Sequence, residues 1–183
     1  MSTTPAASAL LEALRQRSAG VELQTAAAVT APYLVDHRRL YHGQALAVAL
    51  PESTAQLAAL MGACYALDIE MVPQGGNTSY CGGATPDTSG RQLVIGLGRM
   101  SRVRAIDPAN FSITVEAGCL LANVQRAAAE ADCYFPLELG SAGSCQIGGN
   151  LSTNAGGLNV LRFGMMRELA LGIEAVLPDG RVL

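Results

Sequence analysis

Two glycine-rich segments, residues 73–83 and 139–157, constrain what this chain can fold into more than any other feature. They hold four and six of its 20 glycines. Glycine loses more backbone freedom on folding than any other residue, so this density is expected mainly where the backbone takes a positive φ or comes very close to another group. We therefore expect neither segment to form an ordinary helix or a packed strand, and we expect the close neighbour to be a ligand.

The residues between the glycines indicate the kind of ligand. Short hydrogen-bonding side chains alternate with them: Asn77, Thr78, Ser79, Ser141, Ser144, Asn150, Ser152, Thr153 and Asn154. Unobstructed backbone N–H groups in such loops form concave sites for anions. Neither segment contains Lys or Arg, so a phosphate would be held by backbone dipoles. The alternative is a pair of surface loops or a linker, but apolar anchors such as Pro73, Leu139 and Ile147 are not typical of a low-complexity linker.

Composition excludes several classes of protein. The chain is half apolar and 15% charged, which predicts a globular fold of one large domain or two small ones. Its net charge of −3 and lack of a basic cluster argue against a nucleic-acid partner. The only histidines, His37 and His42, have no matching Cys or carboxylate spacing, which argues against a metal site.

The sequence also suggests a compartment. Five cysteines without a CxxC pair predict reduced thiols. The first residues lack the basic and apolar regions of a secretory signal, and no apolar run reaches the roughly 20 residues of a membrane span. We therefore expect a cytoplasmic protein without a transmembrane segment.

Apolar periodicity predicts the elements of the first half. Thr4 and Pro5 predict the N-cap and first residue of a short helix, followed by irregular structure to residue 44. A buried strand at 45–50, a helix from a Ser53/Gln56 capping box to Leu67 and a strand at 69–72 form a β-α-β unit with parallel strands. This unit delivers residues 73–83 to the carboxyl end of a strand, where open α/β sheets bind ligands.

The second half continues with strands and one helix. Strands are expected at 92–97, 103–106, 111–116 and 169–177, with a helix at 120–131. Alternation in the third of these strands places Glu116 toward solvent, and Cys81 and Cys145 are expected to be small space-filling thiols. Residues 178–180 form a turn whose return strand has only three residues, so we expect the chain to be an N-terminal fragment with a hairpin cut short.

Three common nucleotide-binding and hydrolase motifs are missing. The nearest approach to the Rossmann fingerprint, residues 96–101, has Ser at the third glycine position and leads into a strand. No GxxxxGK[ST] sequence occurs, and the pairs Gly140-Ser141 and Gly143-Ser144 do not complete the GxSxG sequence of serine hydrolases.

Several sequences in a fixed order carry a resemblance to a known family. They are VPQGGNT (72–78), GG (82–83), PLELGSAGSCQIGGN (136–150), TNAGG (153–157), RFG (162–164) and LPDG (177–180). Over residues 33–183 the chain resembles FAD-linked oxidases of the vanillyl-alcohol-oxidase type, which have a PCMH-type FAD-binding domain. Within these it is most similar to D-2-hydroxyglutarate and D-lactate dehydrogenases and the FAD subunit of glycolate oxidase.

The resemblance implies an α+β fold of two lobes with the flavin between them. Residues 1–44 would be a helix and irregular lead-in, 45–135 the first lobe, and 136–183 the start of an incomplete second lobe. The substrate-binding cap domain would be absent. FAD would be non-covalent, because relatives that tether it use a His where this chain has Asn77.

The resemblance also implies cofactor-binding residues by matching position. The diphosphate side would be Pro73, Gln74, Gly75, Gly76, Asn77, Thr78, Ser79 and Gly82. The flavin and ribityl would be lined by Pro136, Gly140, Ser141, Gly143, Ser144, Ile147, Gly148 and Asn154, with support from Gly149, Asn150, Thr153, Gly156 and Gly157. The Val176 backbone would face the adenine. Ser79-Tyr80 and Phe163 depart from the common pattern, which affects local contacts.

The implied activity is oxidation of a D-2-hydroxy acid to the 2-oxo acid. In the family a base removes the hydroxyl proton and the α-hydrogen passes to flavin N5 as hydride. Its catalytic residues come from later regions, so we assign none here and expect this chain alone to be inactive. The alternatives are a non-catalytic FAD-binding or partner-docking module, and a flavin oxidase of the same fold with another substrate. Self-association through the shortened hairpin edge is also expected.

Overall fold

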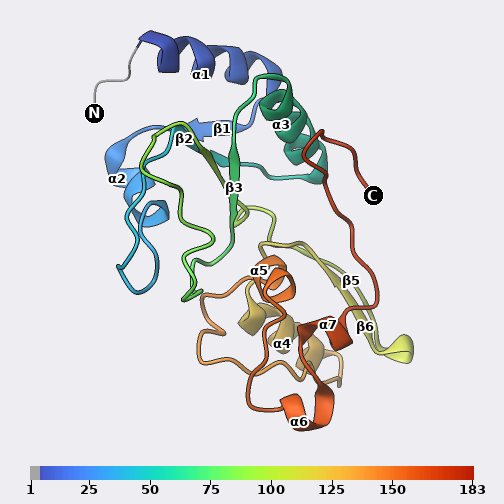
Figure 1. Cartoon of the computed structure of the whole chain (residues 1–183). Coiled ribbons are helices and arrows are strands. Elements are labelled where there is room, and N and C mark those ends of the chain that lie inside the picture. Colours follow the sequence, from blue (N-terminus) through green and yellow to red (C-terminus); the bar gives the residue numbers. More distant parts are fainter. Residues whose placement is uncertain (1–4) are drawn as a thin grey trace. The chain divides into compact units, whose positions relative to one another are not determined.

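The computed structural model describes residues 5–183 of the chain, and the predicted N-cap Thr4 lies outside them. The fold is mixed α and β, as expected. It divides into two compact units, one comprising residues up to Arg99 together with Glu174–Leu183, the other comprising Met100–Ile173 (Figure 1). Each unit is described by itself.

The first unit is built on a four-stranded sheet. Its strands are β1 (Glu22–Gln24), β2 (Ala47–Leu50), β3 (Met71–Gln74) and β4 (Leu93–Gly96). Their order is β1-β2-β4-β3, with β1 antiparallel to β2 and the other three strands parallel. The parallel β-α-β prediction is confirmed, although β4 lies between the two strands of that unit. Figure 1 shows how β3 leads into the first glycine-rich segment.

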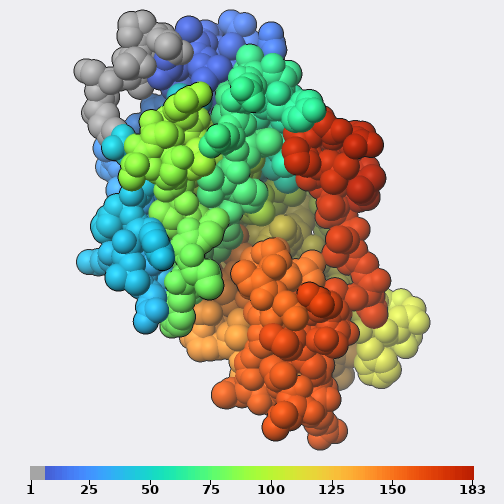
Figure 2. All heavy atoms as spheres, in the orientation of Figure 1, coloured from blue at the N-terminus to red at the C-terminus, as the bar shows by residue number. Residues whose placement is uncertain are grey.

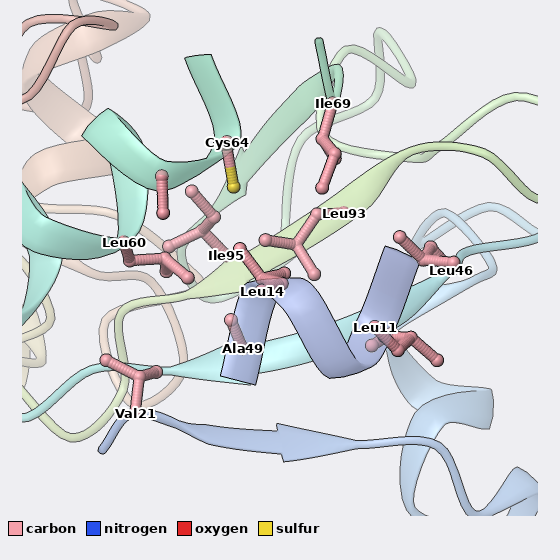
Figure 3. Packing of buried hydrophobic residues seen from close by; sticks show 12 residues of the cluster. Leu11, Leu14, Val21, Leu46, Ala49, Leu60, Cys64, Ile69, Leu93 and Ile95 are labelled. Atoms are coloured by element: carbon pink, nitrogen blue, oxygen red, sulfur yellow. The ribbon is translucent and has the colours of Figure 1, made fainter. Parts of the chain in front are cut away.

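Helices α1 (Pro5–Arg17) and α3 (Thr54–Ala66) cover this sheet with apolar side chains. In Figure 3, Leu14 of α1 and Leu60 of α3 meet Leu93 and Ile95 of β4. All four side chains are almost completely buried, which removes apolar surface from water and stabilises the unit. This core holds the strand whose carboxyl end begins the first glycine-rich segment.

The start of α3 follows the predicted capping motif with one difference. Ser53 Oγ accepts from Gln56 N at 3.2 Å, as an N-cap should. The Gln56 side chain accepts instead from Glu52 N, at 2.8 Å, one residue earlier than in a capping box. The lead-in also contains short helical turns, α2 (Ala27–Thr30) and η1 (Ala31–Tyr33), where no assignment could be made from the sequence.

The last ten residues pack on α3. The predicted turn is present, and Ala175 and Leu183 exchange two backbone hydrogen bonds of 3.0 and 2.8 Å. A Cβ at Gly62 of α3 would lie 3.3 Å from Asp179 O. The absence of a side chain at Gly62 therefore lets the turn at Asp179 pack closely on α3. Figure 2 shows this end of the chain, in red, against the teal surface of α3.

The second unit combines a β-ribbon with four helices. Strands β5 (Val103–Asp107) and β6 (Ser112–Val115) pair antiparallel through η2 (Pro108–Asn110). The helices are α4 (Leu121–Glu130), α5 (Ile147–Ser152), α6 (Val160–Phe163) and α7 (Met166–Leu169). Their core gathers Cys119, Leu121, Val124, Leu137, Cys145, Ile147 and Met166.

The units divide at Arg99, whereas the expected lobes divided after residue 135. The β5–β6 ribbon pairs only with itself, and Ile113 and Val115 pack on the core that contains Leu121 of α4. The ribbon therefore belongs with the second glycine-rich segment.

Other sequence predictions are corrected. The strand expected at 169–177 is wrong: α7 ends at Leu169, and only Val176 forms a bridge, with Val182. Alternating apolar residues make a strand only where a partner supplies the ladder, and in the described part of the chain residues 170–174 have none. The described helices include no segment long and apolar enough to cross a bilayer.

Candidate cofactor-binding site

The first glycine-rich segment begins inside a strand. Pro73 and Gln74 complete β3, and residues 75–83 continue outside any strand, so the segment as a whole is not a packed strand, as expected. Gly75 and Gly76 follow without a positive φ, and the left-handed residue is Asn77, at φ 51°. Asn tolerates this conformation better than most residues with a side chain. The glycines here are therefore not explained by backbone conformation.

Two side-chain amides of this segment point back into the protein. Gln74 is 2% exposed, and its Nε2 donates to Tyr33 O at 3.0 Å and Ala84 O at 2.7 Å. Asn77 Nδ2 donates to Val35 O at 2.8 Å and to Pro32 O at 3.3 Å. These donors brace the loop and leave its backbone as the surface available to an anion.

The end of the segment contacts the lead-in. The Tyr80 ring lies 5.0 Å from the Arg38 guanidinium carbon. A Cβ at Gly82, whose φ is 69°, would lie 2.5 Å from the Tyr41 ring, so protein packing requires this glycine. Cys81 is exposed, and the expectation of a space-filling thiol there is wrong.

The second segment forms a tight turn and then a helix. Ser144 N and Cys145 N both donate to Ser141 O at 2.8 Å. At the start of α4, Leu121 N donates to Cys145 O at 3.1 Å and Ala122 N to Ala142 O at 3.0 Å. Cys145 is buried in the core, which agrees with a space-filling role. The turn that carries Gly140 to Ser144 is thus fixed on the first residues of α4.

The short helix α5 (Ile147–Ser152) occupies the middle of this segment, which was not predicted from the sequence, although the rest of residues 139–157 lies outside it. Ile147 N donates to Cys119 O at 3.0 Å and Gly148 N to Ala117 O at 2.8 Å. A Cβ at Gly148 would lie 2.8 Å from the Ala117 side chain. Glycine is therefore needed at position 148, because the chain at Ala117 passes too close for a side chain. The buried side chain of Ile147 anchors the helix in the core.

Three glycines of the same segment have no such neighbour. A Cβ at Gly140, Gly143 or Gly149 would meet nothing within 4 Å among the described residues. None of the three has a positive φ. Neither backbone conformation nor packing requires glycine there, so the backbone at these three positions is open to close approach by another group.

Two buried acceptors lie beside this open space in the sequence. Asn150 is 5% exposed, and its Oδ1, like Gln146 Oε1, has no hydrogen-bond partner among the described residues. Leaving a buried acceptor unpaired costs about 1–3 kcal/mol. A ligand with N–H or O–H donors would satisfy them, which fits the ribityl hydroxyls and the ring N–H of a flavin. The sequence analysis missed Gln146, whose spacing of four from Asn150 is the available signal.

The remaining predicted residues hold the ends of the segments. Thr153 Oγ1 donates to Gly149 O at 2.8 Å, and Asn154, at φ 49°, accepts from Arg167 N at 2.9 Å. A Cβ at Gly157 would lie 2.1 Å from Glu138 O, whereas one at Gly156 would lie 3.3 Å from the Val160 side chain. Elsewhere Pro136 O accepts from Asn159 Nδ2 at 3.2 Å. The predicted residues thus fall in both units: residues 73–82 and, separately, Val176 belong to the first, and residues 136–157 belong to the second.

Glu116 is buried, so the expectation that it faces solvent is wrong. It is 2% exposed, and Arg102 binds it through the side chain at 2.8 Å and the backbone N at 2.9 Å. The Arg102 hydrogen bond is the main cause that lowers the pKa of Glu116. Burial, and then the charge of Glu116, raise the pKa of the Cys119 thiol. The sequence signal was the pair Arg102 and Arg104 on the neighbouring strand, both of which pair with this carboxylate.

Comparison with known families gives one match. A family model described as an FAD binding domain matches residues 45–183. This range contains both glycine-rich segments and every residue predicted to bind the cofactor.

Curated relatives match the same region. A probable mitochondrial D-2-hydroxyglutarate dehydrogenase of Oryza sativa subsp. indica is 42% identical over 143 residues, 78% of this chain and 25% of the relative. The mitochondrial D-2-hydroxyglutarate dehydrogenase of Danio rerio is 39% identical over 81% of this chain and 28% of its own length. A putative mitochondrial D-lactate dehydrogenase of Schizosaccharomyces pombe is 37% identical over 90% of the chain and 31% of the relative. The chain thus spans between a quarter and a third of these relatives.

The expected cytoplasmic location is contradicted by these relatives, which are named mitochondrial. The expectation depended on the absence of a secretory signal and of a membrane span. Import into mitochondria uses a different signal, which is amphipathic and Arg-rich. The absence of a secretory signal and a membrane span therefore carried no information about mitochondrial import.

Solved structures share the fold. Alkyldihydroxyacetonephosphate synthase superposes with a TM-score of 0.83 at 18% identity, over 100% of this chain and 34% of that one. A chitooligosaccharide oxidase gives 0.76 at 20% identity, over 96% and 36%. Fold and motifs agree with the family match: this chain belongs to the FAD binding domain family.

Proposed function

We propose that this chain binds FAD non-covalently through both glycine-rich segments, as the cofactor-binding part of a protein that oxidises a D-2-hydroxy acid to the 2-oxo acid. The observation that carries the proposal is the open space at Gly140, Gly143 and Gly149, close in sequence to the unpartnered acceptors of Gln146 and Asn150. Space and unpaired polar atoms together are what a bound flavin and ribityl chain require.

Each segment has its own part in binding. In the first, the backbone of residues 75–79 would hold the diphosphate, since the segment contains no Lys or Arg and the Gln74 and Asn77 amide nitrogens are already used. In the second, residues 140–150 would line the flavin and ribityl. The Val176 backbone in the hairpin on α3 would meet the adenine.

The Asn77 side chain supports non-covalent binding. An amide nitrogen is not a nucleophile that could form a bond to the flavin, and here it donates to the backbone at Val35 and Pro32.

The substrate class rests on the relatives named D-2-hydroxyglutarate and D-lactate dehydrogenases. FAD, when bound, would accept the two electrons of the oxidation. This chain's residues would orient and bury the cofactor, and we assign none of them as a base or a substrate-carboxylate clamp. The substrate site would belong to other parts of the proposed protein.

The test is a titration of the cofactor-free chain with FAD, in which binding is measured as the quenching of flavin fluorescence. We expect saturable binding at one equivalent, and acid precipitation of the complex should release all yellow colour to the supernatant. Absence of saturable binding would remove the proposal, and colour retained in the pellet would contradict the non-covalent part of it.

A further inference from the structure

The lead-in residues 31–35 receive hydrogen bonds from two side chains of the first glycine-rich segment. Gln74 Nε2 reaches Tyr33 O at 3.0 Å, and Asn77 Nδ2 reaches Val35 O at 2.8 Å and Pro32 O at 3.3 Å. The same five residues therefore support the loop at both its first residue and its left-handed residue. They precede the part of the chain that the FAD-binding family model matches, which begins at residue 45.

These residues lie across the carboxyl end of the sheet. Gln74 and Gly96 are paired partners at the ends of β3 and β4. A Cβ at Gly96 would lie 2.9 Å from the Tyr33 ring, so Tyr33 packs directly on the end of β4. Residues 31–35 thus contact the carboxyl ends of both β3 and β4, the edge of the sheet where a ligand is expected.

Residues 31–35 and the turn that follows them are themselves held by hydrogen bonds. Gly43 N donates to Leu34 O at 2.7 Å. The buried carboxylate of Asp36 accepts from Tyr41 N at 2.6 Å and Arg38 N at 3.0 Å. A loop braced against an ordered segment loses less conformational freedom when it binds a ligand.

Asn77 is the residue through which this bracing acts most directly. Its φ of 51° is unfavourable for residues with a side chain, and both hydrogen bonds of its amide hold it there. Because the amide nitrogen is directed at the lead-in carbonyls, it is used within the protein and not on a ligand.

We propose that Asn77 is a positioning residue: together with Gln74 it ties residues 75–79 to residues 31–35, so that the diphosphate-binding backbone is formed before FAD arrives. The proposal deepens the proposed function, on which it rests. It adds residues 31–35, outside the matched domain, to the structure that FAD binding depends on.

Three variants of Asn77 separate the hydrogen bonds from the backbone conformation. Asn77→Asp has the same shape but replaces both donors with a carboxylate facing two carbonyls. Asn77→Gly removes the donors yet accepts a positive φ, and Asn77→Ala removes the donors and disfavours the φ. We expect Kd for FAD to rise about 10- to 100-fold in Asn77→Asp, mostly through slower association, and Asn77→Ala to be weaker than Asn77→Gly. Asn123→Asp on α4, outside both segments, is the matched control and should bind like wild type.

Two further measurements distinguish positioning from direct contact and from general damage. Backbone 15N relaxation without FAD should show residues 75–79 ordered in the wild type, with order parameters of about 0.85, and mobile in Asn77→Asp. Riboflavin has no diphosphate, so its affinity should not change in that variant. Weaker FAD binding with unchanged loop order parameters would make Asn77 a direct ligand. Loss of riboflavin binding as well would indicate general misfolding. Either outcome overturns the proposal.

The relaxation experiment does not depend on cofactor. If the wild type binds no FAD, the proposed function fails, whereas the order of the loop still reports on the bracing. Mobile residues 75–79 in the wild type, with FAD binding intact, would overturn the inference alone.

Discussion

At single positions, the glycines of the two segments serve different physical purposes. Gly82, Gly148 and Gly157 are required because a side chain would meet another part of the protein within 3 Å. Gly140, Gly143 and Gly149 meet no such neighbour among the described residues. The first group therefore concerns stability, and we propose that the second serves the close approach of FAD.

Substitution of one glycine from each group should separate these effects. Gly143→Val should weaken FAD binding about 10- to 100-fold, because its side chain would occupy space proposed for FAD and overpacking commonly costs about 1–3 kcal/mol. Thermal unfolding of the free chain should change little, because no described residue lies within 4 Å of a Cβ at Gly143. Gly148→Val should lower the unfolding temperature, because its Cβ would lie 2.8 Å from the Ala117 side chain. Fluorescence titration and thermal denaturation measure the two. Gly172→Val, exposed and without a near neighbour, is the control; equal loss of FAD affinity there would contradict the assignment.

Glu116 is expected to make stability depend on acid pH. Its pKa is lowered from the ordinary value of 4.5 in the folded state, so its contribution is present above that value and is lost as pH falls through the lower folded value. Glu116→Gln should lower stability at pH 7 by on the order of 1–3 kcal/mol, because buried hydrogen bonds to Arg102 are lost. Urea unfolding at several pH values should show this difference shrinking below about pH 4.5. A difference independent of pH would mean that the carboxylate charge is not responsible.

At the scale of elements, local sequence patterns predicted the positions of single helices and strands better than they predicted which strands pair. The apolar runs of β2 and β4 and the stripe of α3 carried enough periodicity to place them. Residues 169–177 carried a similar alternation. In the structure Leu169 is the last residue of α7, and the residues after it pair with no strand until Val176 bridges Val182. Periodicity reports which side chains can be buried, whereas a strand also needs a neighbour.

The packing of the last hairpin on α3 gives a prediction at this scale. Gly180 has φ 87°, and a Cβ there would lie 2.6 Å from Ala58 O. Gly180→Ala should therefore destabilise the docked turn by more than about 1 kcal/mol and increase amide exchange at Ala175, Leu177 and Leu183. Gly172→Ala, without a positive φ or a near neighbour, should leave that exchange unchanged. Unaltered exchange in Gly180→Ala would show that the turn is not held by this contact.

For the whole molecule, we expect FAD binding without turnover. Neither glycine-rich segment contains a Lys or Arg to hold a substrate carboxylate, and orientation of the substrate contributes much of the rate in such a reaction. The FAD-loaded chain should therefore keep its flavin absorbance when mixed anaerobically with D-lactate, D-2-hydroxyglutarate or glycolate. Dithionite serves as the positive control for reduction. Bleaching by a hydroxy acid at an enzyme-like rate would place the catalytic residues within this chain.

The sequence by itself determined the cofactor and much of the framework. Glycine density, short donors and the order of the motifs are local properties, and they predicted an FAD-binding α+β domain whose first segment follows a parallel strand. Only the tertiary structure decided which glycines face open space, that Glu116 is buried under Arg102, and that Asn77 is tied to residues 31–35. The physical reason is that these facts depend on atoms distant in the chain: a 2.8 Å clash or a hydrogen bond across 42 positions leaves no periodic trace in the sequence.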